Sequence, residues 1–282
     1  MAEKMIHSDG IELFTESFGD PTDTPLLLIM GAMSSMVYWD EEFCRKLANQ
    51  GRFVIRYDNR DVGRSTCYEP GKLNYTVSDM ADDILRIMDA YGLGKAHLIG
   101  MSLGGMLAQI AAIKYPERIQ SITLISSGII ETDESREFPP MDERILAYHA
   151  RSAELDWSDK AAVADYLVTG SRLLSGSKHS FDAERAAVQV HQEIERANNL
   201  LSMFNHALLE SDESFQGTSK QVTVPVLIIH GTEDTILPYG HALALMEEIP
   251  HAKLVRLEGT GHELPAGDWD EIIKAITSHT AI

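Results

Sequence analysis

The segment 100–104 has the pattern Gly-x-Ser-x-Gly and places the hydroxyl of Ser102 between two glycines. The apolar run 96–99 before it predicts a short buried strand, and the run 105–113 after it has the period and composition of a helix. A serine at a sharp turn from a strand into a helix presents its hydroxyl at the carboxyl edge of a sheet. We therefore interpret Ser102 as a catalytic nucleophile. The alternative interpretation is an ordinary serine in a tight turn.

A nucleophilic serine needs a base, and His262 is the candidate. It ends the segment Gly-Thr-Gly-His at 259–262, directly after the apolar run 252–257, which predicts a strand. The flanking glycines favour a turn that brings the imidazole over Ser102. Two other histidines, His97 and His230, fall in apolar runs and are expected to be buried.

The base needs a carboxylate to orient it, and Asp234 is the candidate for that acid. It follows the predicted strand 226–230 by a short turn, so its carboxylate could accept the Nδ1–H of the imidazole. Glu233 is the adjacent alternative. An acid after the preceding strand is another known arrangement, but the run 122–130 contains Ser126-Ser127-Gly128 and offers no carboxylate there. The chain order Ser, Asp, His is the order of α/β-hydrolases.

Two backbone N–H groups are the expected donors to the oxyanion of a tetrahedral intermediate. One is that of Leu103, at the start of the helix, where the helix dipole also favours negative charge. The other is that of Ala32, because Gly31 lets the chain turn close to the substrate after the apolar run 26–30. Each such donor typically contributes about 3 kcal/mol of transition-state stabilisation.

Short apolar runs alternate with helical patterns along most of the chain. This alternation predicts an α/β fold with a doubly wound, mostly parallel sheet. The predicted strands are 11–18, 26–30, 53–57, 96–99, 119–125, 226–230 and 252–257, and helices are predicted at 39–49 and 77–91.

The alternation stops between residues 130 and 219, where four amphipathic helical patterns follow one another. They cover 141–153, 158–174, 180–199 and 200–210. A helical block inserted before the penultimate strand predicts a cap over the carboxyl edge, where open α/β sheets bind ligands. The alternative is a bundle packed on the side of the sheet. The predicted domains are a core of residues 1–130 and 219–282 and a cap of residues 131–218.

The segment 200–210 is rich in large apolar side chains, which either pack within the cap or line a pocket. Met203 and His206 are predicted to contact substrate from this segment. Gly31 and Met33 are predicted to do so from the turn that carries the oxyanion donor. If side chains of the segment face the pocket, the substrate is apolar.

Composition limits the possible partners. The chain has 282 residues, 44% of them hydrophobic, and a formal net charge of −19, which disfavours nucleic acid and anionic membranes. Its two cysteines are expected to be free thiols, and no secretory signal or membrane-spanning run is evident, so we expect a cytoplasmic protein. No metal-ligand spacing and no nucleotide-binding glycine pattern is present, so neither metal nor cofactor is predicted.

Taken together, five segments resemble the α/β-hydrolase superfamily over essentially the whole chain: 29–32, 57–65, 100–105, 225–234 and 259–262. Within that superfamily the chain is most similar to capped carboxylesterases such as aclacinomycin methylesterase. The resemblance implies a serine hydrolase that cleaves a small-molecule carboxylic ester, such as a methyl ester or lactone of an apolar compound, through an acyl-enzyme.

The sequence departs from the common pattern of this superfamily at two positions. Asp61 stands where many members have glycine, and Met101 stands where many have histidine. Neither position belongs to the predicted triad. Asp58 and Arg60, in the same segment as Asp61, are expected to hold their loop through ion pairs or backbone hydrogen bonds.

Other activities use the same three residues. A cofactor-free haloperoxidase or perhydrolase would use peroxide in place of water, and a carbon–carbon bond hydrolase would need a polar anchor for a dienoate. A sensor that binds a small molecule and signals through its lid is an alternative of another class. The serine at position 102 argues against the relatives of this fold that use an aspartate nucleophile.

Overall fold

One mixed sheet organises the computed structural model, which describes residues 1–130, 138–209 and 217–281. Among these residues the sheet has eight strands in the order β1-β2-β4-β3-β5-β6-β7-β8. The pairs β1/β2 and β2/β4 are antiparallel, and every pair from β4 onward is parallel. The strands are β1 Ala2–Ser8, β2 Ile11–Phe18, β3 Thr24–Ile29, β4 Arg52–Tyr57, β5 Ala96–Met101, β6 Ile119–Ile125, β7 Val226–Gly231 and β8 Lys253–Leu257.

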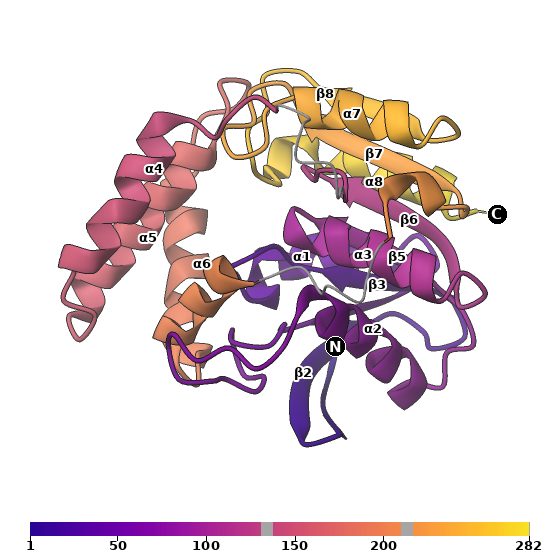
Figure 1. The fold of residues 1–282 in the computed structure, drawn as a ribbon, viewed down its shortest axis with the longest axis horizontal. Coiled ribbons are helices and arrows are strands. Elements are labelled where there is room, and N and C mark those ends of the chain that lie inside the picture. The colour runs from indigo at the N-terminus through magenta and orange to yellow at the C-terminus, as the bar shows by residue number, and fades with distance from the viewer. Residues whose placement is uncertain (131–137, 210–216, 282) are drawn as a thin grey trace.

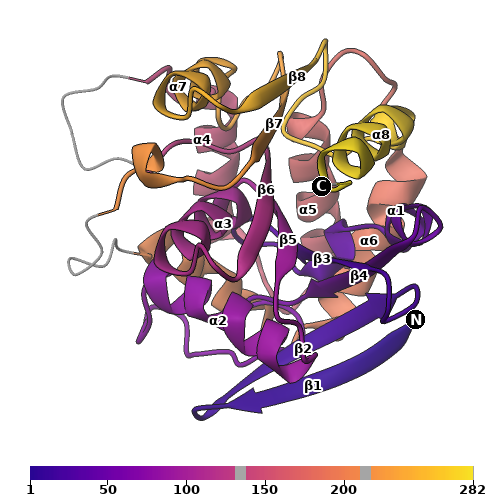
Figure 2. The same ribbon diagram turned by 90° about the vertical axis from the view of Figure 1, so that its right-hand side faces the viewer.

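Helices cover both faces of the sheet (Figures 1 and 2). Side chains of β3 alternate between two apolar cores: Leu27 and Ile29 pack with α2, α3 and α7, whereas Leu26 and Leu28 pack with α1 and α8. A strand that is buried on both faces needs apolar residues throughout, which is why the parallel strands were visible as continuous apolar runs. The predicted doubly wound, mostly parallel α/β fold is confirmed. The helices are α1 Glu41–Ala48, α2 Val77–Ala90, α3 Leu103–Lys114, α4 Glu143–Ala150, α5 Lys160–Leu174, α6 Ala183–Arg196, α7 Gly240–Glu248 and α8 Trp269–His279.

Several helices begin later than their patterns suggest, and the cause is an aspartate cap. The carboxylates of Asp40, Asp142, Asp159 and Asp182 accept backbone N–H groups in the first turns of α1, α4, α5 and α6. A capping residue lies outside the helix that it starts. The predictions that counted these aspartates as helical are therefore too long at their N-terminal ends.

Between β6 and β7 the described chain is helical. It forms α4, η2 (Arg151–Glu154), α5, α6, the 3₁₀ segment η3 (Leu200–Leu208), where a helical pattern was predicted at 200–210, and the short 3₁₀ segment η4 (Ser219–Gln221). Helix α5 packs on α4 and α6, and α6 packs on η1 (Met36–Tyr38) of the sheet-forming part of the chain. Figure 1 shows α4 and α5 standing beside the sheet. The predicted cap begins at residue 131, outside the described residues, and the division into core and cap stays a prediction.

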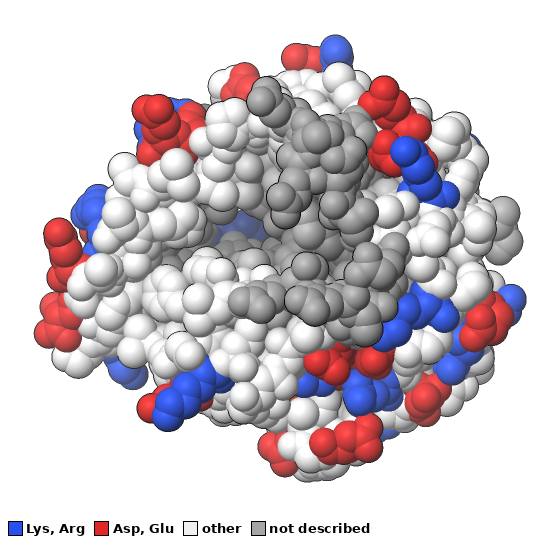
Figure 3. All heavy atoms as spheres, in the orientation of Figure 1, with Lys and Arg blue, Asp and Glu red and all other residues white. Residues whose placement is uncertain are grey.

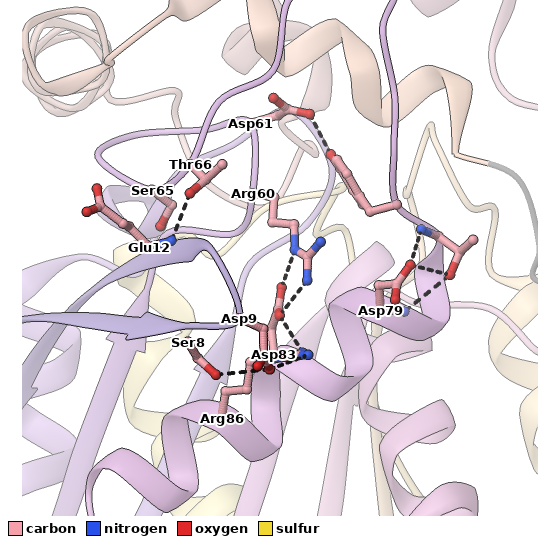
Figure 4. Close-up of polar contacts among 12 residues, drawn as sticks. Ser8, Asp9, Glu12, Arg60, Asp61, Ser65, Thr66, Asp79, Asp83 and Arg86 are labelled. Atoms are coloured by element: carbon pink, nitrogen blue, oxygen red, sulfur yellow. Dashed lines mark hydrogen bonds and ion pairs between the residues drawn. The ribbon is translucent and has the colours of Figure 1, made fainter.

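The loop after β4 is fixed by buried charges (Figure 4). Both guanidinium nitrogens of Arg60 that face Asp83 donate to its carboxylate, at 2.7 and 2.8 Å, and both side chains are buried. Asp61, with a left-handed φ of 67°, accepts the hydroxyl of Tyr75 at 2.7 Å. Arg60 thus has the structural role expected from the sequence.

The turn from β5 into α3 depends on glycine at position 104. A Cβ there would lie 2.1 Å from the carbonyl oxygen of Ile29, a backbone atom that cannot move aside. We expect Gly104→Ala to lower the free energy of unfolding by more than about 3 kcal/mol in urea titrations. Gly94→Ala is the matched control, because a Cβ at position 94 meets nothing within 4 Å. Equal unfolding midpoints for the two variants would contradict this account of the turn.

Candidate active site

Ser102 lies between the last residue of β5 and the first residue of α3, with φ 53° and ψ −121°. A left-handed φ is uncommon outside glycine and marks a backbone held in place by its surroundings. Its N–H donates to the carbonyl of Ile125 at 2.9 Å. A Cβ on Gly31 would lie 3.1 Å from the Cβ of Ser102, so the chain after β3 passes close beside the serine.

His262 and Asp234 form a buried pair behind the serine turn. The Nδ1–H of His262 donates to Oδ2 of Asp234 at 2.8 Å. The other oxygen of Asp234 accepts the N–H groups of Ile236 and Leu237 at 2.9 and 2.8 Å. Burial opposes ionisation of Asp234, but the charge and hydrogen bond of His262 outweigh it, and its pKa lies below the ordinary value. The carboxylate therefore stays charged and accepts the Nδ1–H, so in the neutral imidazole Nε2 is the nitrogen that can accept a proton.

Glu233, the alternative acid, contacts a different part of the chain. Its carboxylate accepts the N–H and the hydroxyl of Ser177, at 2.8 and 2.7 Å. In the structure, therefore, Asp234 pairs with His262, whereas Glu233 binds the insertion between β6 and β7. His230, predicted to be buried, is fully buried, and its Nε2 lies 2.8 Å from the carbonyl oxygen of Leu237.

Ser102 and His262 both line a cavity of about 510 Å³. Gly31, Ala32 and Met33 border the same cavity from the turn after β3. The rest of its wall is largely aromatic, aliphatic and methionine side chains, among them Tyr38, Met101, Tyr148, Tyr166, Phe181, Met203, Phe204 and Trp269.

Met203 and His206, which were predicted to contact substrate from the insertion, lie in different surroundings. Met203 lines the cavity as predicted, with its neighbour Phe204, whereas Leu201 and Leu208 point outward and are 36% and 50% exposed. His206 is buried and does not border the cavity. Its Nδ1 accepts the N–H of Met33 at 2.8 Å, and its Nε2 donates to a carbonyl at 2.7 Å. We therefore revise the role predicted for His206: it holds the turn that borders the cavity.

The two predicted oxyanion donors are the backbone N–H groups of Leu103, directly after the serine, and of Ala32, in the turn after β3. Leu103 is the first residue of α3, so its N–H has no acceptor within the helix. Ala32 follows Gly31 and precedes Met33, which has a left-handed φ of 61°. Within the described part of the chain, neither the Leu103 nor the Ala32 N–H donates to a protein acceptor.

The aromatic wall of the cavity was not predicted. Its members come from η1, α4, α5, the α5–α6 loop, η3 and the start of α8, and none has a sequence signature beyond helical spacing. Helical spacing shows that a side chain is buried, and it does not show whether the side chain faces another helix or a cavity.

A buried carboxylate on α6 adjoins the turn after β3. Ser35 donates its hydroxyl to Glu193, and the neighbouring Asp58 pairs with Arg196 at 2.9 Å. Asp58 also accepts the N–H of Met36 at 2.9 Å. Burial raises the pKa of Glu193 to about 7, and the nearby carboxylate of Asp58 acts in the same direction. Arg196 thus pairs with Asp58 directly, and its charge partly opposes the rise in the pKa of Glu193, where the insertion meets the sheet.

Charged side chains are unevenly placed on the surface. Figure 3 shows one face hollowed, with uncharged side chains along much of its described border and most Lys, Arg, Asp and Glu toward the outer edge of the view. Among the described residues, no cluster of three or more His, Cys, Asp or Glu side chains could hold a metal ion. None of the described helices has both the length and the apolar character to span a membrane. Both cysteines are free thiols.

Residues 24–266 match the α/β hydrolase fold family. A rhodomycin D methylesterase of Streptomyces sp. (strain C5) is 32% identical, over 99% of this chain and 98% of that protein. A second rhodomycin D methylesterase, from Streptomyces peucetius, is 31% identical over the same shares. An esterase structure from Exiguobacterium antarcticum superimposes with a TM-score of 0.81 at 18% identity, covering 100% of both chains.

The chain therefore belongs to the α/β-hydrolase family, as the sequence motifs predict, and it is a carboxylic ester hydrolase.

Glu193 should make stability depend on pH. Its pKa is about 7 in the folded chain against an ordinary value of 4.5, so between these values the folded state holds a proton that the unfolded state has lost. The free energy of unfolding should therefore fall as pH rises from about 5 to about 8, by up to about 3 kcal/mol from this group. Glu193→Gln keeps an acceptor for Ser35 and removes this titration.

Urea unfolding of both proteins at pH 5 and pH 8 checks the prediction. The variant should lose less stability than the wild type on going to the higher pH. Parallel pH dependences would show that Glu193 does not titrate in this range.

Proposed function

We propose that this chain hydrolyses its ester through a Ser102–His262–Asp234 triad and an acyl-enzyme. The observation that carries the proposal is that Ser102, on a left-handed turn, and His262, held by Asp234 at 2.8 Å, line one cavity. A serine hydroxyl, an imidazole and a buried carboxylate in this relation constitute the machinery of acyl transfer.

In the proposed reaction, the Oγ of Ser102 attacks the ester carbonyl while Nε2 of His262 takes its proton. The imidazolium is stabilised by Asp234, whose lowered pKa keeps it ionised. His262 then protonates the leaving alkoxide. Water, activated by the same imidazole, attacks the acyl-enzyme, and the carboxylic acid leaves with Ser102 restored.

The tetrahedral oxyanion in this proposal accepts the N–H groups of Ala32 and Leu103. Both N–H groups lack a protein acceptor among the described residues, and both adjoin Ser102. The N-terminal end of α3 adds the favourable end of its dipole. Backbone donors are already oriented, so they need no rearrangement when charge develops.

The substrate that we propose is a methyl ester on an apolar ring system, bound beneath a cap that comprises residues 131–218. The cavity of about 510 Å³ has the size of a site for a multi-ring molecule, and its aromatic wall suits flat, apolar rings. The two relatives named rhodomycin D methylesterases support the methyl ester part of this proposal. The proposed reaction requires only this chain, a small-molecule ester and water.

The triad is tested by substitutions of Ser102 and Asp234, with the adjacent acid Glu233 as the control. With a chromogenic ester, Ser102→Ala should abolish turnover, and Asp234→Asn should lower kcat by about four orders of magnitude, because an amide favours the wrong imidazole tautomer. Glu233→Gln, which changes the adjacent residue in the same way, should retain activity close to wild type. Wild-type turnover by Ser102→Ala or Asp234→Asn would refute the triad.

The substrate class is tested with a panel of methyl esters. Methyl esters of acids with three or four fused rings should have kcat/KM values at least about a hundredfold above that of methyl butyrate, because they bury more apolar area. Phe181→Ala should reduce that preference and leave methyl butyrate hydrolysis unchanged. Equal kcat/KM values across the panel would exclude an apolar ring-binding site.

A further inference from the structure

The chain that joins α5 to α6 lies against the loops that carry the proposed acid and base. We call residues 174–179 the connector. The N–H of His262 donates to the carbonyl of Leu174 at 2.8 Å, and the N–H of Lys178 donates to the carbonyl of Gly259 at 2.9 Å. In Figure 2 this stretch of chain passes close to the loop after β8. The connector thus pairs with the base loop much as a short strand would.

Two glutamates hold the connector, and each adjoins a member of the triad in sequence. Glu263, directly after His262, accepts the N–H of Gly176 at 2.7 Å. Glu233, directly before Asp234, accepts the N–H of the next connector residue, Ser177, at 2.8 Å and its hydroxyl at 2.7 Å. Consecutive backbone N–H groups are therefore bound from the base side and from the acid side.

The contact leaves no space between the two backbones. A Cβ on Gly176 would lie 2.1 Å from the carbonyl oxygen of Gly259, and one on Gly261 would lie 2.0 Å from that of Leu174. The acid loop joins the same assembly, because the N–H of Glu233 donates to the carbonyl of Thr260 at 3.0 Å. A shift of the connector would therefore have to move both loops or break these bonds.

The connector also borders two spaces. One is the cavity that contains Ser102, and the other is a recess of about 600 Å³ that Asp234 and Glu233 line. Ser175 borders both.

We propose that Glu233 and Glu263 are positioning residues for catalysis: by binding consecutive N–H groups of the connector they lock the base loop and the acid loop together. This inference rests on the proposed triad. An imidazole that must first take a proton from serine and then return it to the leaving group loses rate steeply when its orientation is loosened. Neither glutamate exchanges a proton with substrate in this role.

Glu233 allows the cleaner test, because its side chain is exposed and does not border the cavity. Removing it leaves no void in the core and no lost substrate contact. Glu233→Ala should lower kcat about tenfold with KM changed less than about twofold, since geometry is disturbed and binding is not. Glu233→Gln keeps an oxygen that accepts the Ser177 N–H and should restore kcat to within about threefold of wild type.

Glu258→Ala is the matched control. Glu258 is an exposed glutamate in the base loop that pairs with Arg256 and accepts the hydroxyl of Thr232 at 3.4 Å, and among the described residues it has no bond to the connector. Rates are expressed per active site after titration with a fluorophosphonate that labels the serine, at a temperature well below unfolding. A purely structural role for Glu233 would lower the unfolding midpoint and leave the rate per labelled site at the wild-type value.

The outcomes separate the two proposals. If Ser102→Ala and Asp234→Asn are inactive while Glu233→Ala matches Glu258→Ala in kcat, the positioning role is wrong and the triad stands. If Ser102→Ala retains wild-type turnover, the triad itself is wrong. A loss of kcat in Glu233→Ala that glutamine restores, with KM unchanged, supports the positioning role.

Discussion

The carbonyl oxygen of Ile29 occupies the place where a side chain at position 104 would begin, 2.1 Å from an ideal Cβ. That close approach sets how sharply the chain turns from β5 into α3. The same crowding recurs at position 100, where a Cβ would lie 2.1 Å from the carbonyl of Gly104. Only with both glycines can Ser102 take its left-handed φ and leave the sheet at its carboxyl edge. This close approach of α3 to the end of β3 sets the positions of the cavity, of the neighbouring turn at Gly31 and of the start of α3.

Much of the sheet could be predicted because its interior strands are buried on both faces. The run 226–230 is apolar apart from His230, and β7 lies there. Strand β6 lies in the run 119–125, where isoleucine and leucine predominate despite Gln120, Ser121 and Thr123. The edge strand β1 was not predicted: its sequence, Ala2–Ser8, is mostly exposed and is held by antiparallel pairing with β2. Helices α7 and α8 were not predicted either. Backbone pairing at an edge leaves little trace in the side chains.

The residues Ser102, Asp234 and His262 were recognised because each follows a strand that the sequence makes visible, and adjacent parallel strands bring their carboxyl ends together. The features that the sequence did not indicate depend on contacts across long separations. His206 bonds to Met33, and Glu193 meets Ser35, each through a hydrogen bond between the insertion and the turn after β3. Neither pairing leaves a local pattern in the sequence. His206, which the sequence suggested as a pocket residue, therefore holds the turn after β3 in the structure.

The end of β6 lies between the strand of the serine and the strand of the acid. Ser127 donates its hydroxyl to the carbonyl of Ser102 at 2.8 Å, and a Cβ on Gly105 would lie 2.5 Å from that hydroxyl. Ser126 has a left-handed φ of 45°. Ser127 thus supports the serine turn. A carboxylate cannot donate a hydrogen bond to the Ser102 carbonyl, so an aspartate at position 127 could supply an acid at the end of β6 only with the loss of this support.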